Sequence, residues 1–299
     1  MLNSSFAETI NLIYIAAKVR LGFLIMACTL AGIAVSPPSS LSTLQILALA
    51  ICVLVASSTS GAFNQWFERD IDSLMDRTKE RPFVTKELEP SNAWNIWLAV
   101  ISLVALYLTY LIANIEASFY LFAGIFTYGI VYTVWLKRKT WMNIVIGGLA
   151  GSFAVLVGSA ATGNTFSPPA LILSVVLFLW TPPHFWALSI SFKDDYAKAA
   201  IPMLPVVSTI KVTSHAIFWH TLLLVFLSFT LVFYSMHWVY LLFATSGGFY
   251  FLYASFQLLR QQNSFWAKKT FFASIIHLGL LLLGAMFDAM IFAQRANIL

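Results

Sequence analysis

The sequence predicts an all-α membrane protein whose nine transmembrane helices form one bundle, with a cytoplasmic N-terminus and a periplasmic C-terminus. Hydrophobic residues make up 60% of the 299 residues, charged residues only 10%, and the mean hydropathy is +0.84. A soluble domain carries about 25% charged residues, so that class is excluded. The other two observations are the length of the apolar runs and the position of the basic residues between them.

The apolar runs have the length that a helix needs to cross a bilayer, which is about 20 residues. They lack the alternation of a β-barrel, and an open chain in lipid can satisfy its backbone groups only as a helix. Nine runs reach or approach this length: 21–37, 43–65, 92–112, 117–135, 142–162, 169–189, 214–234, 238–258 and 270–292.

The basic residues fix the count and the orientation of these helices. Nine helices place 16 of the 17 lysines and arginines on one side and leave Arg295 alone on the other. Cytoplasmic loops are rich in Lys and Arg, so the crowded side is predicted to be cytoplasmic. A model with eight or ten helices would place these basic residues on both sides of the membrane.

The first residues indicate neither a signal peptide nor a transit peptide. The first 17 residues contain no basic residue and no small-residue cleavage site. We expect residues 1–20 to form an interfacial amphipathic segment, with Phe6 and Ile10 among its apolar residues. A bacterial inner membrane is the simplest location for the whole multi-pass chain.

The stretch after the second predicted helix contains most of the residues that indicate a chemical function. Residues 68–89 hold 12 of the 29 charged residues, including seven of the 12 acids. Asn64, Glu68 and Asp72 are spaced four residues apart, which places their side chains on one face of a helix. Such oxygen ligands suit Mg²⁺, which completes its coordination with water and phosphate oxygens. The pattern predicts a metal–diphosphate site, with Arg77 and Arg81 binding phosphate.

A solvated loop of mixed charge is the alternative interpretation of this stretch. Two observations favour the functional one. Asn64 and Glu68 lie at the end of an apolar helix, where polar groups are costly and tend to be functional. The acids also precede the bases, an order that a positive-inside loop does not require.

A second charged stretch follows the sixth predicted helix. Asp194 and Asp195 form an acidic pair that could hold a second Mg²⁺, although an isolated surface pair is an alternative. His184 follows Pro182 and Pro183 inside the helix, where it could bind a substrate or simply pack against a neighbour. Acids at the cytoplasmic rim favour an enzyme over a transporter, whose charged sites usually lie near the midplane. A transporter with a cation-binding loop remains an alternative.

The motif Asn64-x-x-x-Glu68-x-x-x-Asp72 resembles the NxxxDxxxD motif of the UbiA-type intramembrane prenyltransferases. Its continuation through Arg81 and Pro82 is similar to the haem O synthase branch of that superfamily, the protohaem IX farnesyltransferases. Three further stretches resemble the same branch, and the likeness runs from about residue 20 to 290: 132–148, 181–188 and 193–205.

The resemblance implies one polytopic prenyltransferase domain over residues 1–299, with cytoplasmic active-site loops at 66–91 and 190–213. It implies transfer of a farnesyl group from farnesyl diphosphate to a vinyl group of haem b, with addition of water, giving haem O. Mg²⁺ would assist ionisation of the diphosphate. An aromatic acceptor, such as 4-hydroxybenzoate or a quinone precursor, is the alternative within the superfamily.

The resemblance also assigns residues and partners. Asn64, Glu68 and Asp72 would hold Mg²⁺, with Asp194 or Asp195 at a second ion. His184 would contact haem. Glu68 replaces the commoner Asp, and Ser191 stands where the superfamily has an acid. The partners would be the lipid bilayer and a haem A synthase or terminal oxidase assembly, with no nucleic acid. The cations implied to bind diphosphate are Arg77, Arg81, Lys137, Arg138 and Lys193.

Overall fold

The computed structural model describes residues 6–36, 41–234 and 236–296, and these residues are helical with no β-strand. The all-α prediction is therefore confirmed for the described chain. Eight described segments are long and apolar enough to cross a membrane. Five of them are or lie in single helices: α3 (Thr43–Phe67), α6 (Ala93–Ile112), α10 (Pro168–Ser191), α14 (Trp238–Gln261) and residues Ser264–Phe292 of α15 (Ser264–Ala296). The other three each join two helices: α7 (Ile115–Phe126) with η1 (Thr127–Leu136), α8 (Asn143–Gly147) with α9 (Leu149–Ala161), and α13 (Ile210–Phe229) with η2 (Thr230–Phe233).

The ninth predicted span is a bent pair of helices. Helix α1 covers Phe6–Ala16 and α2 covers Val19–Ala34, and their axes differ by 54°. The described residues thus contain eight spans, or nine if this pair counts as one. The bend falls at Lys18, whose φ of 49° lies in the left-handed region and interrupts the helix. Periodicity gave no sign of this break.

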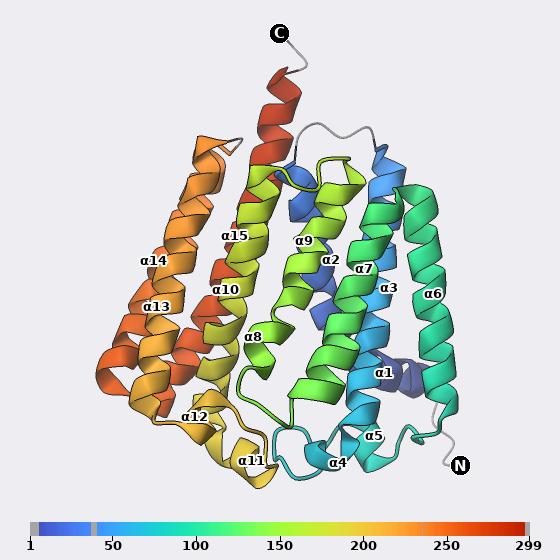
Figure 1. Cartoon of the computed structure of the whole chain (residues 1–299), viewed down its shortest axis with the longest axis vertical. Coiled ribbons are helices and arrows are strands. Elements are labelled where there is room, and N and C mark those ends of the chain that lie inside the picture. The colour runs from blue at the N-terminus through green and yellow to red at the C-terminus, as the bar shows by residue number, and fades with distance from the viewer. Residues whose placement is uncertain (1–5, 37–40, 235, 297–299) are drawn as a thin grey trace.

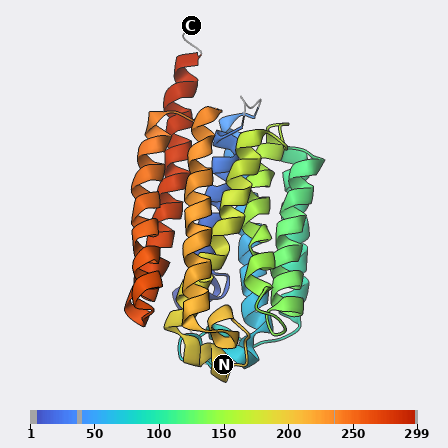
Figure 2. The same ribbon diagram turned by 60° about the vertical axis from the view of Figure 1, so that its left-hand side comes forward.

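The long helices stand side by side in one bundle (Figures 1 and 2). Each packs on the next in chain order from α2 to α15, and α15 returns to pack on α2. Helix α2 also packs on α9, and α10 also packs on α15, which fills the centre. Helix α1 and the last turns of α15 lie at opposite ends of the bundle (Figure 1).

Two glycines bring α2 and α9 into close contact. A Cβ built on Gly158 would lie 2.0 Å from the carbonyl oxygen of Thr29, and one built on Gly32 would lie 2.2 Å from that of Val155. Small residues of this kind let membrane helices approach closely. The outer helix α6 instead exposes large apolar side chains, including Trp97 and Leu103, as expected of a surface that faces lipid.

Short helices gather at one end of the bundle, called here the site end (Figure 1). The connection after α3 contains α4 (Arg69–Asp72) and α5 (Pro82–Thr85), and the connection after α10 contains α11 (Lys193–Lys198) and α12 (Leu204–Val207). A shared hydrophobic cluster includes Ile71 and Met75 from the first connection and Tyr196 and Ile201 from the second. The two predicted loops therefore pack together.

The long helices extend further into both loops than predicted. Helix α3 continues to Phe67, α10 continues to Ser191, and α13 begins at Ile210. These helices therefore overlap the ends of the predicted active-site loops 66–91 and 190–213, because helical hydrogen bonding continues where the apolar pattern weakens.

Candidate active site

The structure keeps Asn64, Glu68 and Asp72 on successive turns, although two helices carry them. Helix α3 ends at Phe67 and α4 begins at Arg69, so Glu68 lies at the junction. The amide of Glu68 still donates to the carbonyl of Asn64 at 3.0 Å, and that of Asp72 donates to Glu68 at 2.8 Å. The four-residue hydrogen bonds continue across the junction, and the expected common face survives. All three side chains are buried.

Asn64 is oriented by its contact with η1. Its amide nitrogen donates to the hydroxyl of Thr133 at 2.9 Å, and that hydroxyl donates to the carbonyl of Tyr128 at 2.8 Å. The amide nitrogen is therefore committed to the helix wall. The amide oxygen is left to face the site, where Lys18 donates to it.

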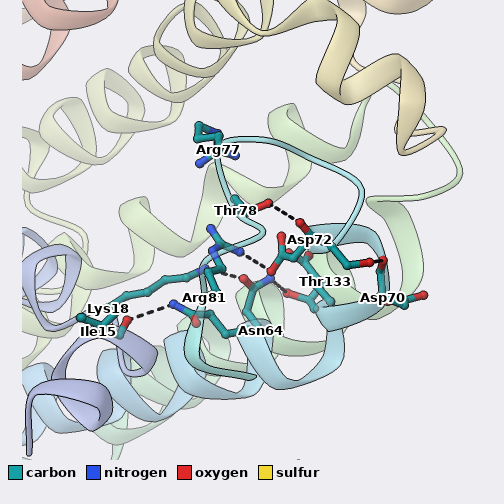
Figure 3. Close-up of polar contacts among 12 residues, drawn as sticks. Ile15, Lys18, Asn64, Asp70, Asp72, Arg77, Thr78, Arg81 and Thr133 are labelled. Atoms are coloured by element: carbon teal, nitrogen blue, oxygen red, sulfur yellow. Dashed lines mark hydrogen bonds and ion pairs between the residues drawn. The ribbon is translucent and has the colours of Figure 1, made fainter. Parts of the chain in front are cut away.

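Each carboxylate of the trio is paired with one cation. Lys137 forms an ion pair with Glu68, and Arg81 forms one with Asp72. Lys137 directly follows the π-helical segment η1, and a turn of this type inside a membrane span is often found at functional sites. Figure 3 shows the side chains of Lys18 and Arg81 directed toward Asn64 and Asp72.

The donor set fits a divalent cation of the Mg²⁺ type. Oε1 of Glu68 and Oδ1 of Asp72 are buried and accept no hydrogen bond within the described chain. Buried polar atoms are rarely left unpaired, so these two oxygens call for a further partner. No cluster of three His, Cys, Asp or Glu side chains suited to a metal occurs in the described ranges. Two carboxylates and one amide leave room for substrate oxygens, which is how Mg²⁺ usually binds.

Lys18 is a site residue that the sequence did not single out. It donates to Asn64 and, at 3.2 Å, to the hydroxyl of Tyr128. Gly61 allows this approach, because a Cβ there would lie 2.8 Å from the carbonyl oxygen of Ala17. In the sequence, Lys18 contributes only to the positive charge that indicates the orientation in the membrane. Its position directly before an apolar run was the available signal.

Arg77 lies apart from Asn64 and Asp72 (Figure 3). Its backbone amide donates to Asp195 at 3.4 Å, and its guanidinium lies 3.5 Å from the hydroxyl of Tyr196. Asp195 is buried, whereas Asp194 and Lys193 are exposed. The acidic pair is therefore divided: only Asp195 faces the first connection.

Arg138 is held by Asp70 and by none of the three predicted metal ligands. Its two terminal nitrogens each lie 2.7 Å from an oxygen of Asp70. This hydrogen-bonded pair lowers the pKa of the Asp70 carboxyl. Arg138 therefore lies in a different polar group from its neighbour Lys137.

His184 lies inside α10, among aromatic rings. Its ring stacks on Trp180 with the centroids 4.3 Å apart, and on Phe271 at 4.6 Å. Its Nδ1 is 2.7 Å from the hydroxyl of Ser274. Its Nε2 makes no hydrogen bond to another described residue.

Comparisons with known proteins identify the class to which this helical bundle belongs. The sequence profile of the UbiA prenyltransferase family matches residues 25–276. The chain is 45% identical to "Protoheme IX farnesyltransferase 2" of Paramagnetospirillum magneticum, over 95% of this chain and 99% of that protein. It is 38% identical to "Protoheme IX farnesyltransferase" of Rickettsia akari, over 87% and 86%.

Solved structures share the fold. A digeranylgeranylglyceryl phosphate synthase has a TM-score of 0.76 at 20% identity, covering 94% of this chain and 99% of its own. A UbiA homologue from Archaeoglobus fulgidus bound to DMAPP and Mg²⁺ has a TM-score of 0.69 at 13% identity, covering 92% and 98%. The chain belongs to the UbiA prenyltransferase family.

Proposed function

We propose that this chain transfers the farnesyl group of farnesyl diphosphate to a vinyl group of haem b, with addition of water, to give haem O. The observation that carries the proposal is the buried trio Asn64, Glu68 and Asp72 with two unpartnered carboxylate oxygens. The choice of farnesyl and haem rests on the 45% identity with a protohaem IX farnesyltransferase over nearly the whole length of both proteins.

The trio and the surrounding cations form the diphosphate end of the site. Asn64, Glu68 and Asp72 would hold Mg²⁺, which would neutralise charge on the leaving diphosphate. Three basic side chains face two carboxylates here. Such a pocket suits a diphosphate. The relative from A. fulgidus bound to DMAPP and Mg²⁺ supports this choice of ligands.

The chain's own residues would then control the allylic cation. Tyr128 and Tyr132 stack with centroids 5.6 Å apart, on the η1 segment that carries Thr133. Aromatic faces stabilise cations and exclude water, which protects the farnesyl cation until the vinyl group attacks. The farnesyl tail would lie between the membrane spans.

The second connection would close the site. Asp195 accepts from the backbone of Arg77 and so joins the two connections. Asp194, Asp195 and Lys193 stay candidates for a second Mg²⁺ or for diphosphate, and His184 stays the candidate contact for haem through Nε2. Arg77 is placed to bind diphosphate only if this contact rearranges.

The topology proposed is nine spans in a single domain over residues 1–299, with the site end in the cytoplasm. The basic residues support it, because Arg295 lies in the last turns of α15, at the end opposite to the site. A bacterial inner membrane agrees with the bacterial relatives.

Purified protein in lipid nanodiscs, given radiolabelled farnesyl diphosphate and Mg²⁺ with either haem b or 4-hydroxybenzoate, tests the function. We expect label to appear in hydroxyethylfarnesyl haem and nowhere else, and we expect EDTA to stop the reaction. Prenylation of 4-hydroxybenzoate alone would overturn the choice of acceptor. Failure to bind any prenyl diphosphate would overturn the enzyme class.

A further inference from the structure

A hollow of about 390 Å³ opens at the site end, beside the α3–α4 junction. This volume lies within the range of small-molecule sites, about 300–1,000 Å³. Its lining is aromatic and charged, and consists of Trp66, Phe67, Arg69, Asp70 and Arg138. None of these five residues belongs to the trio that faces the diphosphate.

The arginines of this hollow lie against aromatic rings. The guanidinium carbon of Arg69 is 4.8 Å from the centre of the Trp66 ring, and that of Arg138 is 5.6 Å from the centre of the Phe67 ring. Arg138 forms an ion pair with Asp70. Arg69 donates a hydrogen bond to the backbone carbonyl of Trp66 at 2.6 Å and has no carboxylate partner among the described residues. The hollow therefore carries one unneutralised positive charge beside two flat apolar surfaces.

The hollow adjoins the diphosphate site through the backbone. Glu68 and Arg69 are consecutive, and so are Lys137 and Arg138. In each pair, one residue takes part in the buried Glu68–Lys137 ion pair and the next lines the hollow. The hollow and the diphosphate site therefore share two backbone segments, 68–69 and 137–138.

We propose that this hollow binds a carboxylate of the acceptor, with Arg69 as its principal partner and the rings of Trp66 and Phe67 against the flat apolar body of the acceptor. This inference rests on the proposed function. Haem suits the hollow because it is a planar apolar molecule that carries carboxylates on propionate arms. An arginine fork binds a carboxylate through two parallel hydrogen bonds, so the anchor also orients the acceptor.

The donor diphosphate is a poorer fit. Three cations already converge on the trio, whereas the hollow offers only Arg69 free of a carboxylate. Asp70 also repels an incoming anion and competes with it for Arg138. A single carboxylate needs only one arginine, whereas a diphosphate needs several charges at once.

The first test compares Arg69→Gln with the wild type in nanodiscs, using haem b and its dimethyl ester. The substitution should raise the Kd for haem b, followed by the Soret band without farnesyl diphosphate, by about tenfold. The Kd for the ester, which lacks the carboxylates, should be the same for both proteins. The KM for farnesyl diphosphate should not change.

The second test uses Asp70→Asn, which removes the competitor of the ligand for Arg138. A carboxylate site predicts that this variant binds haem b about threefold more tightly, since Arg138 becomes available to the ligand. A purely structural Asp70–Arg138 pair predicts equal or weaker binding, and that result would overturn the proposal.

Arg260→Gln is the matched control, because Arg260 also lies at the site end, 5.9 Å from the centre of the Phe256 ring. It should leave both affinities unchanged. Equal losses for haem and its ester in Arg69→Gln would overturn the inference. So would an effect seen only with anionic lipid in the nanodisc, which would assign the hollow to a lipid phosphate. In either case wild-type turnover of haem would stand, so the proposed function would survive.

Discussion

Asp288 lies at one end of the bundle and Glu68 and Asp72 lie at the other. All three carboxylates are buried, but their hydrogen-bond partners differ. Asp288 on α15 accepts from the backbone nitrogen of His237 at 3.0 Å, from its Nδ1 at 3.0 Å and from the backbone nitrogen of Tyr240 at 2.9 Å. Both of its oxygens are satisfied. Glu68 and Asp72 are equally buried, yet each keeps one oxygen without a partner.

We propose that this difference separates a structural carboxylate from a functional one. Asp288 satisfies amide groups at the start of α14, which would otherwise be unpaired. Glu68 and Asp72 satisfy no helix end and are held by long, mobile cations. An unpaired buried oxygen costs free energy, and it is retained where a ligand completes it.

Asp72→Asn should give the largest effect on activity. The amide keeps the size of the side chain and loses the charge that holds the metal and Arg81. We expect haem farnesylation to fall by at least about 10²-fold. Turnover is measured per folded molecule, because the substitution also leaves Arg81 without its carboxylate partner and lowers the melting temperature. Near-normal turnover would contradict the proposed ligand set.

Lys18→Met should give the next largest loss, because it removes one of three cations from the diphosphate end. We expect a roughly tenfold to 10²-fold loss in kcat/KM for farnesyl diphosphate, with haem binding unchanged. Lys18→Arg keeps the charge and should recover part of the activity. Identical losses for both substitutions would indicate that Lys18 only fills space at the break between α1 and α2.

Asp288→Asn makes the same chemical change as Asp72→Asn at the opposite end and should differ in its effect on activity. The new amide nitrogen faces N–H donors, so we expect the free energy of unfolding to fall by about 2 kcal/mol. Activity per folded molecule should stay at the wild-type level. Denaturation and turnover of the two variants, measured side by side, test the comparison directly.

Asp70→Asn should have the smallest effect on stability, below about 0.5 kcal/mol, because the Asp70–Arg138 pair is exposed. Arg138 lowers the folded-state pKa of Asp70. The pair therefore stabilises the protein above the unfolded pKa, about 4, and this contribution is lost as the pH falls through the folded pKa. Melting temperatures of wild type and variant should converge under acid conditions. A gap that widens there would contradict the assignment.

The sequence predicted the helical spans and the common face of Asn64, Glu68 and Asp72, because both depend on local patterns. The eight spans begin and end within a few residues of the predicted runs. The bend at Lys18 and the π-helical segment η1 were missed, because hydropathy does not report hydrogen-bond register. The trio followed from helix geometry alone, since residues four apart share a face wherever the helix lies.

The sequence by itself therefore determined the membrane class, the helical runs and the face that carries Asn64, Glu68 and Asp72. Only the tertiary structure decided which cations serve that face. Lys18 lies 46 positions before Asn64, and Lys137 lies 69 positions after Glu68. Whether such distant residues meet depends on how α2, α3 and η1 pack. The adjacent Lys137 and Arg138 also pair with different carboxylates, Glu68 and Asp70, because neighbouring side chains leave a helix end in different directions.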